Sequence, residues 1–327
     1  MIAVERLRKH YRVHKRPPGL RSALRALWHR DYDTVRAVED ISFAIASGEA
    51  VGFLGPNGAG KTTTLKMLAG LLQPTSGSAR VLGFTPGERR ADFLRQVMLV
   101  AAQKQQLIWD LPPAETFELN RAIYGVSRAD FSATVGELTT LLRITDVVNK
   151  PTRQLSLGER MKCELTAALI HRPKVLFLDE PTIGLDVSMQ SIVRSFILEY
   201  NRRYGATILL TSHDMDDVAA ICSRVIVIDK GQLIYQGSLD ALVRQTRPEK
   251  RVSVRLSQPV ARADLERYGQ LVAHEDARAV LQVPHAELAR VLPLLLGTLP
   301  VADISVEDAP LEEVLADLFA RHEVAAS

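Results

Sequence analysis

Hydrophobic positions in the first part of the chain follow two different periods. Apolar and polar residues alternate over residues 2–7 and 38–45, which predicts two half-buried strands. Residues 50–54 form a continuous apolar run, as in a buried strand, and apolar residues within 61–72 recur at helical spacing. A buried strand that leads directly into a helix is typical of an α/β fold with a parallel sheet.

The same two patterns continue to about residue 245. Apolar runs at residues 175–178 and 207–211 predict further buried strands, and residues 224–229 with 232–236 predict a hairpin. Helices are predicted at residues 113–124, 128–143, 159–171 and 188–204, and Ser238 is expected to cap a last helix ending near residue 245.

Beyond residue 250 the pattern predicts a second, smaller domain. Strand-like and helical segments follow in the order βαββαβ, which indicates a ferredoxin-like α+β arrangement, and a final amphipathic helix covers residues 311–319. Residues 246–250 (TRPEK) are predicted to be a linker. We therefore expect an α/β domain at residues 1–245, with a helical subdomain at about 104–172, and a C-terminal domain at residues 251–327.

The most distinctive stretch, GPNGAGKT, lies between the buried strand and the helix that follows it. It is the pattern G-x-x-x-x-G-K-[ST] in its required setting. Glycines allow consecutive backbone N–H groups to turn toward a polyphosphate, and the helix adds its positive N-terminal end. Lys61 can reach the β- and γ-phosphates, the Thr62 hydroxyl can bind Mg²⁺, and Thr63 can add a phosphate contact. The residues predicted to bind nucleotide here are Gly55, Pro56, Asn57, Gly58, Ala59, Gly60, Lys61, Thr62 and Thr63.

Composition is that of a globular protein with a sizeable core. Of 327 residues, 46% are hydrophobic and 24% are charged, and the length suggests two domains. Cys163 and Cys222 both fall in predicted helices, which favours a reducing compartment without structural disulfides. No run of about 18 uninterrupted apolar residues occurs and the N-terminus lacks an apolar signal core, so neither a membrane span nor export is expected.

The net charge of +3 conceals a basic N-terminal segment. Residues 1–36 carry ten Lys and Arg against three acidic residues, so +7 here leaves −4 for the rest of the chain. Within the insert at residues 15–36, a short helix could form at residues 20–28, with basic residues beside its apolar side. This insert could contact a membrane surface or a partner's cytoplasmic helices, and it could equally be a solvated loop with a small apolar anchor.

Further motifs follow the phosphate loop. They are residues 155–159 (LSLGE), which open a predicted helix, 179–180 (DE) at the end of a buried strand, 184–186 (GLD) and 212–214 (SHD). With Tyr11 and Gln103, this set resembles the ABC ATPase family in order and approximate spacing over residues 1–240. In that family these motifs are the signature motif, the Walker B motif, the D-loop and the switch histidine, and Tyr11 and Gln103 match the adenine-stacking aromatic and the Q-loop glutamine.

The resemblance implies a role in catalysis for several of these residues. Asp179 would hold Mg²⁺, since a hard cation beside phosphates prefers carboxylate oxygen. Glu180 would orient and deprotonate the attacking water, and His213 would hydrogen-bond the γ-phosphate. Gln103 would serve both Mg²⁺ and catalysis, although Gln105 and Gln106 in the same AAQKQQ stretch are alternatives.

In the ABC family the signature helix presents its N-terminus to the γ-phosphate of ATP held by another subunit. The resemblance therefore places Ser156, Gly158, Glu159 and Asp186 at the nucleotide site of a dimer, most simply a homodimer. The family's commonest signature is LSGGQ, and here Leu157 replaces its first glycine and Glu159 its glutamine. Because Ser156 and Gly158 are kept, we expect an active ATPase that uses ATP and Mg²⁺.

One ATPase unit without a membrane span implies a separate transmembrane permease. The insert after Tyr11, the WDLP run at residues 109–112 and the tail ending in LEEVLADLF resemble ATP-binding subunits of bacterial type-2 ABC exporters, the drug and antibiotic efflux group. That resemblance predicts a peripheral location on the cytoplasmic face of the membrane. It also places the permease contact between Gln103 and Ser156, and it leaves the cargo to the permease.

Competing interpretations find less support in the sequence. The main alternative is a soluble ABC ATPase acting on ribosomes or nucleic acid, but no second phosphate loop and no long coiled coil occur, so nucleic acid is not expected as a partner. A GTPase would need an N-K-x-D motif, and the sole Asn-Lys pair, Asn149-Lys150, is followed by Pro151-Thr152. Polysaccharide export and import stay open within the ABC class.

Overall fold

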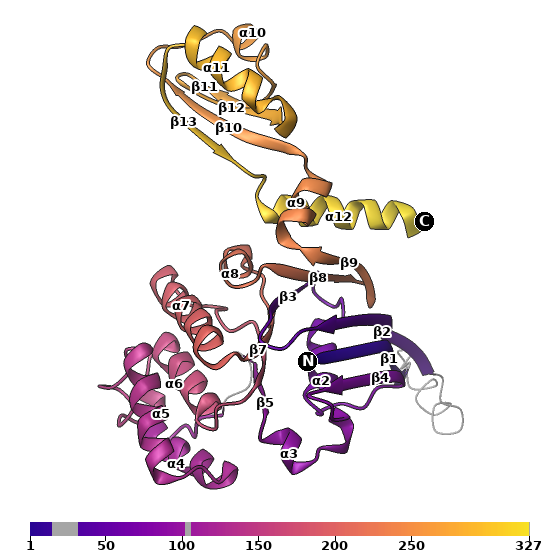
Figure 1. Cartoon of the computed structure of the whole chain (residues 1–327), viewed down its shortest axis with the longest axis vertical. Coiled ribbons are helices and arrows are strands. Elements are labelled where there is room, and N and C mark those ends of the chain that lie inside the picture. The colour runs from indigo at the N-terminus through magenta and orange to yellow at the C-terminus, as the bar shows by residue number, and fades with distance from the viewer. Residues whose placement is uncertain (15–31, 102–105, 327) are drawn as a thin grey trace, which may run out of the picture. The chain divides into compact units, whose positions relative to one another are not determined.

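The computed structural model describes residues 1–14, 32–101 and 106–326. The chain divides into two compact units, residues 1–236 and 237–327 (Figure 1).

The first unit begins with a three-stranded antiparallel sheet in the order β2-β1-β4. Its strands are β1 (Ile2–His14), β2 (Tyr32–Ile45) and β4 (Ser76–Val81). β1 and β2 are much longer than predicted, because they pair from Ile2 opposite Ile45 to His14 opposite Tyr32, with shifts of register between Val4 and His10. Residues 32–36 of the predicted insert therefore belong to a strand, and the short helix predicted at residues 20–28 lies outside the described residues.

A six-stranded sheet in the order β5-β6-β7-β3-β8-β9 forms the centre of the first unit. Neighbouring strands are parallel from β5 through β8, so their carboxyl ends share one edge of the sheet. The buried strands predicted at residues 50–54, 175–178 and 207–211 and the predicted hairpin are confirmed, whereas the strand at residues 97–101 was not predicted. The strands are β3 (Ala50–Leu54), β5 (Val97–Ala101), β6 (Val175–Asp179), β7 (Thr207–Thr211), β8 (Arg224–Asp229) and β9 (Gln232–Ser238).

Helices lie beside this sheet, and Figure 1 shows α4 to α7 gathered on the side away from β1, β2 and β4. The four helices predicted between residues 113 and 204 are confirmed to within two residues, whereas α3 and α8 were not predicted. The helices are α2 (Lys61–Leu68), α3 (Ala91–Leu94), α4 (Pro113–Tyr124), α5 (Arg128–Leu141), α6 (Leu157–Leu169), α7 (Val187–Tyr204) and α8 (Met215–Ile221). Throughout the described part of the chain, no helix combines the length and apolar character needed to cross a bilayer.

One apolar core holds the strand and the helix on either side of the phosphate loop. Phe53 of β3 and Leu65 of α2 are fully buried in the same cluster as Phe93 and Phe177. Burial of each such side chain contributes about 1.5–3 kcal/mol relative to exposure. The phosphate loop is therefore fixed at both ends by packing.

The second unit contains an antiparallel sheet in the order β11-β12-β10-β13. That order, with helices between the first and second and the third and fourth strands, confirms the predicted ferredoxin-like arrangement. Val252 and Val254 of β10 are buried against Leu265 and Leu295 from those two helices. The elements are α9 (Leu239–Thr246), β10 (Glu249–Leu256), α10 (Arg262–Leu265), β11 (Gln270–Glu275), β12 (Arg278–Pro284), α11 (Leu288–Thr298), β13 (Val301–Glu307) and α12 (Leu311–Ala326).

The structure corrects the predicted boundary at residue 245 and the linker at residues 246–250. Compact units divide at residue 236 instead, and α9 belongs to the second one. Arg247 Nε lies 2.7 Å from Asp317 Oδ2 of α12, and the Thr246 carbonyl accepts a hydrogen bond from Arg321. Lys250 pairs with Val283 in the sheet. The polar composition that suggested a linker instead serves ion pairs and strand pairing.

Two truncations are expected to behave differently. A chain ending after Ser238 keeps β9 whole and should bind nucleotide as the full chain does. A chain ending after Lys250 should also bind nucleotide, but it retains α9 and Arg247 without Glu313 and Asp317, so we expect it to be the less soluble of the two. Nucleotide titration with thermal unfolding checks this, and a Ser238 truncation that fails to fold would show that the two units are not independent.

Candidate nucleotide-binding site

Three adjacent parallel strands carry the predicted phosphate and catalytic motifs at one edge of the sheet. β3 leads into the phosphate loop, β6 ends at Asp179 and β7 ends at Thr211, which pairs directly with Asp179. Because β7 lies between β6 and β3, the motifs that follow these strands converge. Ligands in open α/β sheets bind at this edge.

The phosphate loop has a backbone shape that only glycine readily adopts. Gly58 has φ +82° and Gly60 has φ +105°. A Cβ on Gly60 would lie 2.3 Å from the carbonyl oxygen of Ala37, whereas a Cβ on Gly58 would meet no atom within 4 Å. The loop is thus packed closely against β2 at Gly60 and open at Gly58, which leaves backbone N–H groups free to approach a phosphate.

Lys61 begins α2 and folds back over the phosphate loop. Its Nζ donates to the carbonyl oxygens of Gly55 at 2.5 Å and Pro56 at 3.1 Å. Burial lowers the pKa of Lys61, and the nearby carboxylates of Glu180 and Asp179 partly oppose that effect. An incoming phosphate would supply both acceptors and negative charge to this ammonium group.

Thr62 and Asp179 form a pair of oxygen ligands that fits Mg²⁺. The Thr62 hydroxyl lies 2.9 Å from Asp179 Oδ2, and the Thr211 hydroxyl donates to Asp179 Oδ1 at 2.8 Å. Hydroxyl and carboxylate oxygens are hard donors, and Mg²⁺ typically takes one or two protein ligands beside phosphate oxygens. Thr63 follows in the first turn of α2.

Glu180 faces His213 across the end of the sheet. Glu180 Oε1 lies 2.9 Å from His213 Nε2, and both side chains keep some exposure to solvent. The Glu180 backbone has φ +57°, a conformation that costs a non-glycine residue of order 1 kcal/mol. Its N–H donates to the Thr211 carbonyl at 3.0 Å, which helps to hold this conformation. The geometry places a carboxylate, a group that can act as a general base, beside an imidazole.

A buried carboxylate that the sequence did not reveal links the D-loop side to the switch histidine. Asp217 of α8 has no exposed surface, and it accepts hydrogen bonds from the hydroxyls of Thr182 and Ser212 and from Arg194 of α7. Arg194 also pairs with Asp214 at 2.9 Å. The segments before Gly184 and beside His213 are therefore held by one polar cluster. Its sequence signal was the acidic run directly after the SHD motif.

The signature residues lie at the N-terminus of α6. Ser156 caps this helix with Glu159 in a reciprocal arrangement, and the Ser156 hydroxyl donates to Glu159 Oε2 at 2.8 Å. Hydrogen bonds from the Ser156 backbone and hydroxyl lower the pKa of Glu159. A Cβ on Gly158 would lie 3.0 Å from Met189, and Asp186 caps α7 by accepting from the Met189 N–H at 2.9 Å. Signature and D-loop residues are thus neighbours on two adjacent helix starts.

Tyr11 and Gln103 stand apart from these clusters in different ways. Tyr11 is 37% exposed and pairs with Val35, two residues from the Ala37 carbonyl that touches the phosphate loop. Tyr11 therefore lies on the ribbon that packs against the phosphate loop, and its role toward adenine stays a prediction. Gln103 and its alternative Gln105 lie outside the described residues, and the described alternative, Gln106, is bound through its backbone to Glu164.

Comparison with known proteins identifies the family. A family model described as ABC transporter matches residues 38–183. The ABC transporter ATP-binding protein NatA of Bacillus subtilis is 37% identical over 215 residues, which cover 66% of this chain and 87% of NatA. The chain belongs to the ABC transporter ATP-binding proteins. The predicted resemblance is confirmed, and this family member is an ATPase.

Other members of the ABC family differ in transport direction. The Nod factor export ATP-binding protein I of Paraburkholderia xenovorans is 36% identical, covering 65% of this chain and 70% of that protein. The cobalt import ATP-binding protein CbiO of Rhodobacter capsulatus is 34% identical, covering 64% and 75%. Residues 248–307 match the model of the EvrA-like ABC transporter C-terminal domain.

Solved ABC structures share the fold. The ATP-binding cassette MJ0796, in a dimeric post-hydrolysis state bound to ADP and Pi, aligns with a TM-score of 0.61 at 22% identity over 73% of this chain and 99% of that chain. The predicted α/β ATPase fold is confirmed by this likeness together with the topology above.

Proposed function

We propose that this chain is the ATP-hydrolysing subunit of an exporter and works as a homodimer on the cytoplasmic face of the membrane. The observation that carries the proposal is the assembly of Lys61, the Thr62–Asp179 pair and the Glu180–His213 pair at one sheet edge. These groups suit the phosphates, Mg²⁺ and attacking water of ATP hydrolysis. The predicted site residues stay proposals in these roles.

A second copy would complete each site. Ser156 sits at a helix N-terminus, where its hydroxyl and the helix dipole favour an anion. Around it, Leu157 is 46% exposed, Ile183 48% and Val187 78%, an apolar surface that a partner subunit would cover. In the head-to-tail dimer that we propose, Ser156 must release Glu159 before it donates to the partner's γ-phosphate, because a hydroxyl has one proton.

We assign each residue of this site a role in ATP hydrolysis. Thr62 and Asp179 would hold Mg²⁺, which would neutralise charge on the phosphate oxygens. Lys61 holds the β- and γ-phosphates, Glu180 takes the proton of the attacking water, and His213 steadies Glu180 and the γ-phosphate. Tyr11 would stack on adenine, and Gln103 would join Asp179 near the metal.

Export is the direction we favour, with the cargo set by the permease. The family members named for Nod factor export and probable multidrug transport are both 36% identical, against 32% for methionine import and 34% for cobalt import. The type-2 exporter resemblance of the WDLP run and the C-terminal tail points the same way. An action on ribosomes or nucleic acid is the alternative, and the basic residues 1–36 that would suit it suit a membrane surface equally well.

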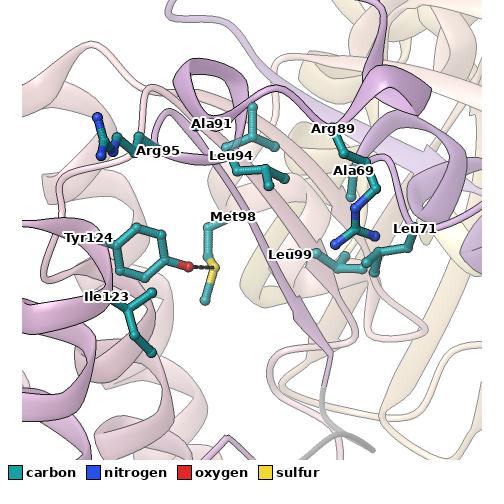
Figure 2. A pocket seen from close by; sticks show the side chains of 11 residues that line it. Ala69, Leu71, Arg89, Ala91, Leu94, Arg95, Met98, Leu99, Ile123 and Tyr124 are labelled. Atoms are coloured by element: carbon teal, nitrogen blue, oxygen red, sulfur yellow. Dashed lines mark hydrogen bonds between the residues drawn. The ribbon is translucent and has the colours of Figure 1, made fainter.

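A groove in the first unit is the surface we propose for the permease. It has a volume of about 410 Å³ and lies among α3, β5 and α4 (Figure 2). Tyr124 is held by stacking on His171, at 3.7 Å between ring centroids, and its hydroxyl faces Met98 at 4.0 Å. The lining is apolar except for two exposed arginines. Its residues are Ala69, Leu71, Arg89, Ala91, Leu94, Arg95, Val97, Met98, Leu99, Ile123 and Tyr124.

This groove extends the contact region predicted between Gln103 and Ser156. Only Ile123 and Tyr124 of its lining come from that region, because α4 packs beside β5 and α3 from earlier in the chain. An amphipathic helix with an acidic residue would match an apolar floor with Arg89 and Arg95 beside it.

The proposal is tested by identifying the membrane protein that copurifies with the chain and by measuring whether its recovery depends on the groove. Purified from native membranes, the chain should bring a six-helix permease, and Ile123→Glu should lower the recovered permease about tenfold or more by placing a charge in the groove. Ile123 is 62% exposed, so the variant should fold and bind nucleotide normally. Leu198→Glu on α7, 41% exposed and outside the groove, is the control. Recovery of ribosomes in place of a permease would overturn the proposal.

A further inference from the structure

A buried carboxylate on the signature helix binds the chain segment that follows β5. Glu164 of α6 is 6% exposed. Its Oε2 accepts the Gln106 N–H at 2.9 Å and its Oε1 accepts the Leu107 N–H at 3.2 Å. Burial raises the pKa of Glu164, and these two backbone bonds oppose that rise. Oε1 alone lies within hydrogen-bond distance of both N–H groups, so glutamine would lose the negative charge of the acceptor, and hydrogen bonds to a charged group are the stronger ones.

The bound segment, residues 106–112, is fastened along its length, and we call it the strap. The backbone N–H of Arg153 donates to the Trp109 carbonyl at 3.0 Å, and Arg160 lies over the Trp109 ring at 5.9 Å from its centroid. The Leu111 carbonyl accepts from both the N–H and the hydroxyl of Thr152, at 3.0 and 2.8 Å. The strap is therefore fixed to α6 and to the residues that lead into it.

The strand that precedes the strap, β5, ends beside the proposed Mg²⁺ ligand Asp179. β5 ends at Ala101, which pairs with Asp179 in β6. Only four residues separate Ala101 from Gln106, and Gln103 is one of them. The chain thus passes from the phosphate side of one site to the helix that carries Ser156, and Glu164 closes that connection.

We propose that Glu164 is a positioning residue that makes the strap and the signature helix move as one body. This inference rests on the proposed function, because it assumes that Gln103 senses nucleotide in one site and that Ser156 serves the other. Ser156 lies eight residues before Glu164, about 12 Å along a rigid helix. Nucleotide bound in a chain's own phosphate loop then sets the position of that chain's signature helix at the partner's nucleotide site.

The first test is a split between nucleotide binding and turnover. In the full chain, Glu164→Gln should leave the Kd for ATP of the isolated subunit unchanged and lower kcat about tenfold, as expected for loss of a bond to a charged group. Thr166→Val on the same helix is the matched control. Thr166 is fully buried and bonds only within α6, to the Lys162 carbonyl at 3.0 Å, so the variant should keep its kcat. Equal kcat values for Glu164→Gln and the wild type would overturn the inference.

The second test measures dimer formation by ultracentrifugation in the Glu180→Gln background. Glu180→Gln alone should dimerise with ATP, and Glu180→Gln/Glu164→Gln should need about tenfold more ATP to do so. If Glu180→Gln alone stays monomeric, the proposed function fails. If both proteins dimerise at the same ATP concentration, the role of Glu164 fails and the proposed function stands.

A milder variant covers the case in which Glu164→Gln does not fold. Thr152→Val removes one side-chain hydrogen bond to Leu111 and leaves the backbone bond in place. It should shift ATP-dependent dimerisation of Glu180→Gln in the same direction, by about threefold. An unchanged ATP requirement in this variant would contradict the strap as a coupling element.

Discussion

Glu180→Gln is expected to lower kcat for ATP by about 100- to 10,000-fold, the usual contribution of a general base. Glutamine keeps the size of glutamate and can still hydrogen-bond His213, which lies 2.9 Å from Glu180 Oε1, but it cannot take a proton from water. ATP binding should stay intact, so the variant should accumulate as an ATP-bound dimer. Phosphate release and sedimentation with ATP measure the two effects.

Glu137→Gln is the matched control for this experiment. Glu137 and Glu180 have similar side-chain exposure, 25% and 22%, but Glu137 pairs with Arg203 on α7, away from the sheet edge. Its substitution should leave kcat unchanged. Wild-type turnover by Glu180→Gln would remove Glu180 from the base role.

Lys61→Met is expected to weaken ATP binding about 100-fold. Lys61 Nζ reaches the Gly55 and Pro56 carbonyls across the loop, and charge-assisted bonds from that position to phosphate oxygens should contribute about 1.5–3 kcal/mol. Fluorescent-nucleotide titration measures the loss.

The melting temperature of Lys61→Met distinguishes a loss of ATP binding from misfolding. Burial lowers the pKa of Lys61, so carrying the ammonium charge in the folded, nucleotide-free protein costs free energy. Methionine removes that charge and keeps the length of the side chain, so the melting temperature without nucleotide should not fall. Tight ATP binding by a stable Lys61→Met variant would contradict the assigned phosphate contact.

The elements predicted well are those whose pattern reflects burial. β3, β6 and β7 are apolar runs that are covered on both faces, and their bounds agree with the sequence prediction. The outer halves of β1 and β2 were missed because that ribbon lacks a buried face: Tyr11 is 37% exposed, Val13 49% and Val35 50%. β4 was missed because only Ala79 and Val81 of its six residues are buried.

The predicted linker at residues 246–250 is an error of a different kind, because its composition suggested a connection where the structure has ordered contacts. Residues 246–250 have the polar, proline-containing composition of a connection, and composition does not report which partners a charge will find. Arg247 meets Glu313 and Asp317, which lie 66 and 70 residues later. An ion pair between such distant residues depends on how the second unit folds.

The sequence by itself determined the phosphate loop, the family and the order of the catalytic motifs, because a glycine-rich loop between a strand and a helix performs its chemistry locally. Only the tertiary structure decided that Thr62 meets Asp179, 117 residues away, and that Glu164 meets Gln106, 58 residues away. Those contacts follow from the parallel strand order and from the packing of α6, which bring distant backbone segments together. Spacing along a chain carries no record of that order, so these two contacts became visible only in three dimensions.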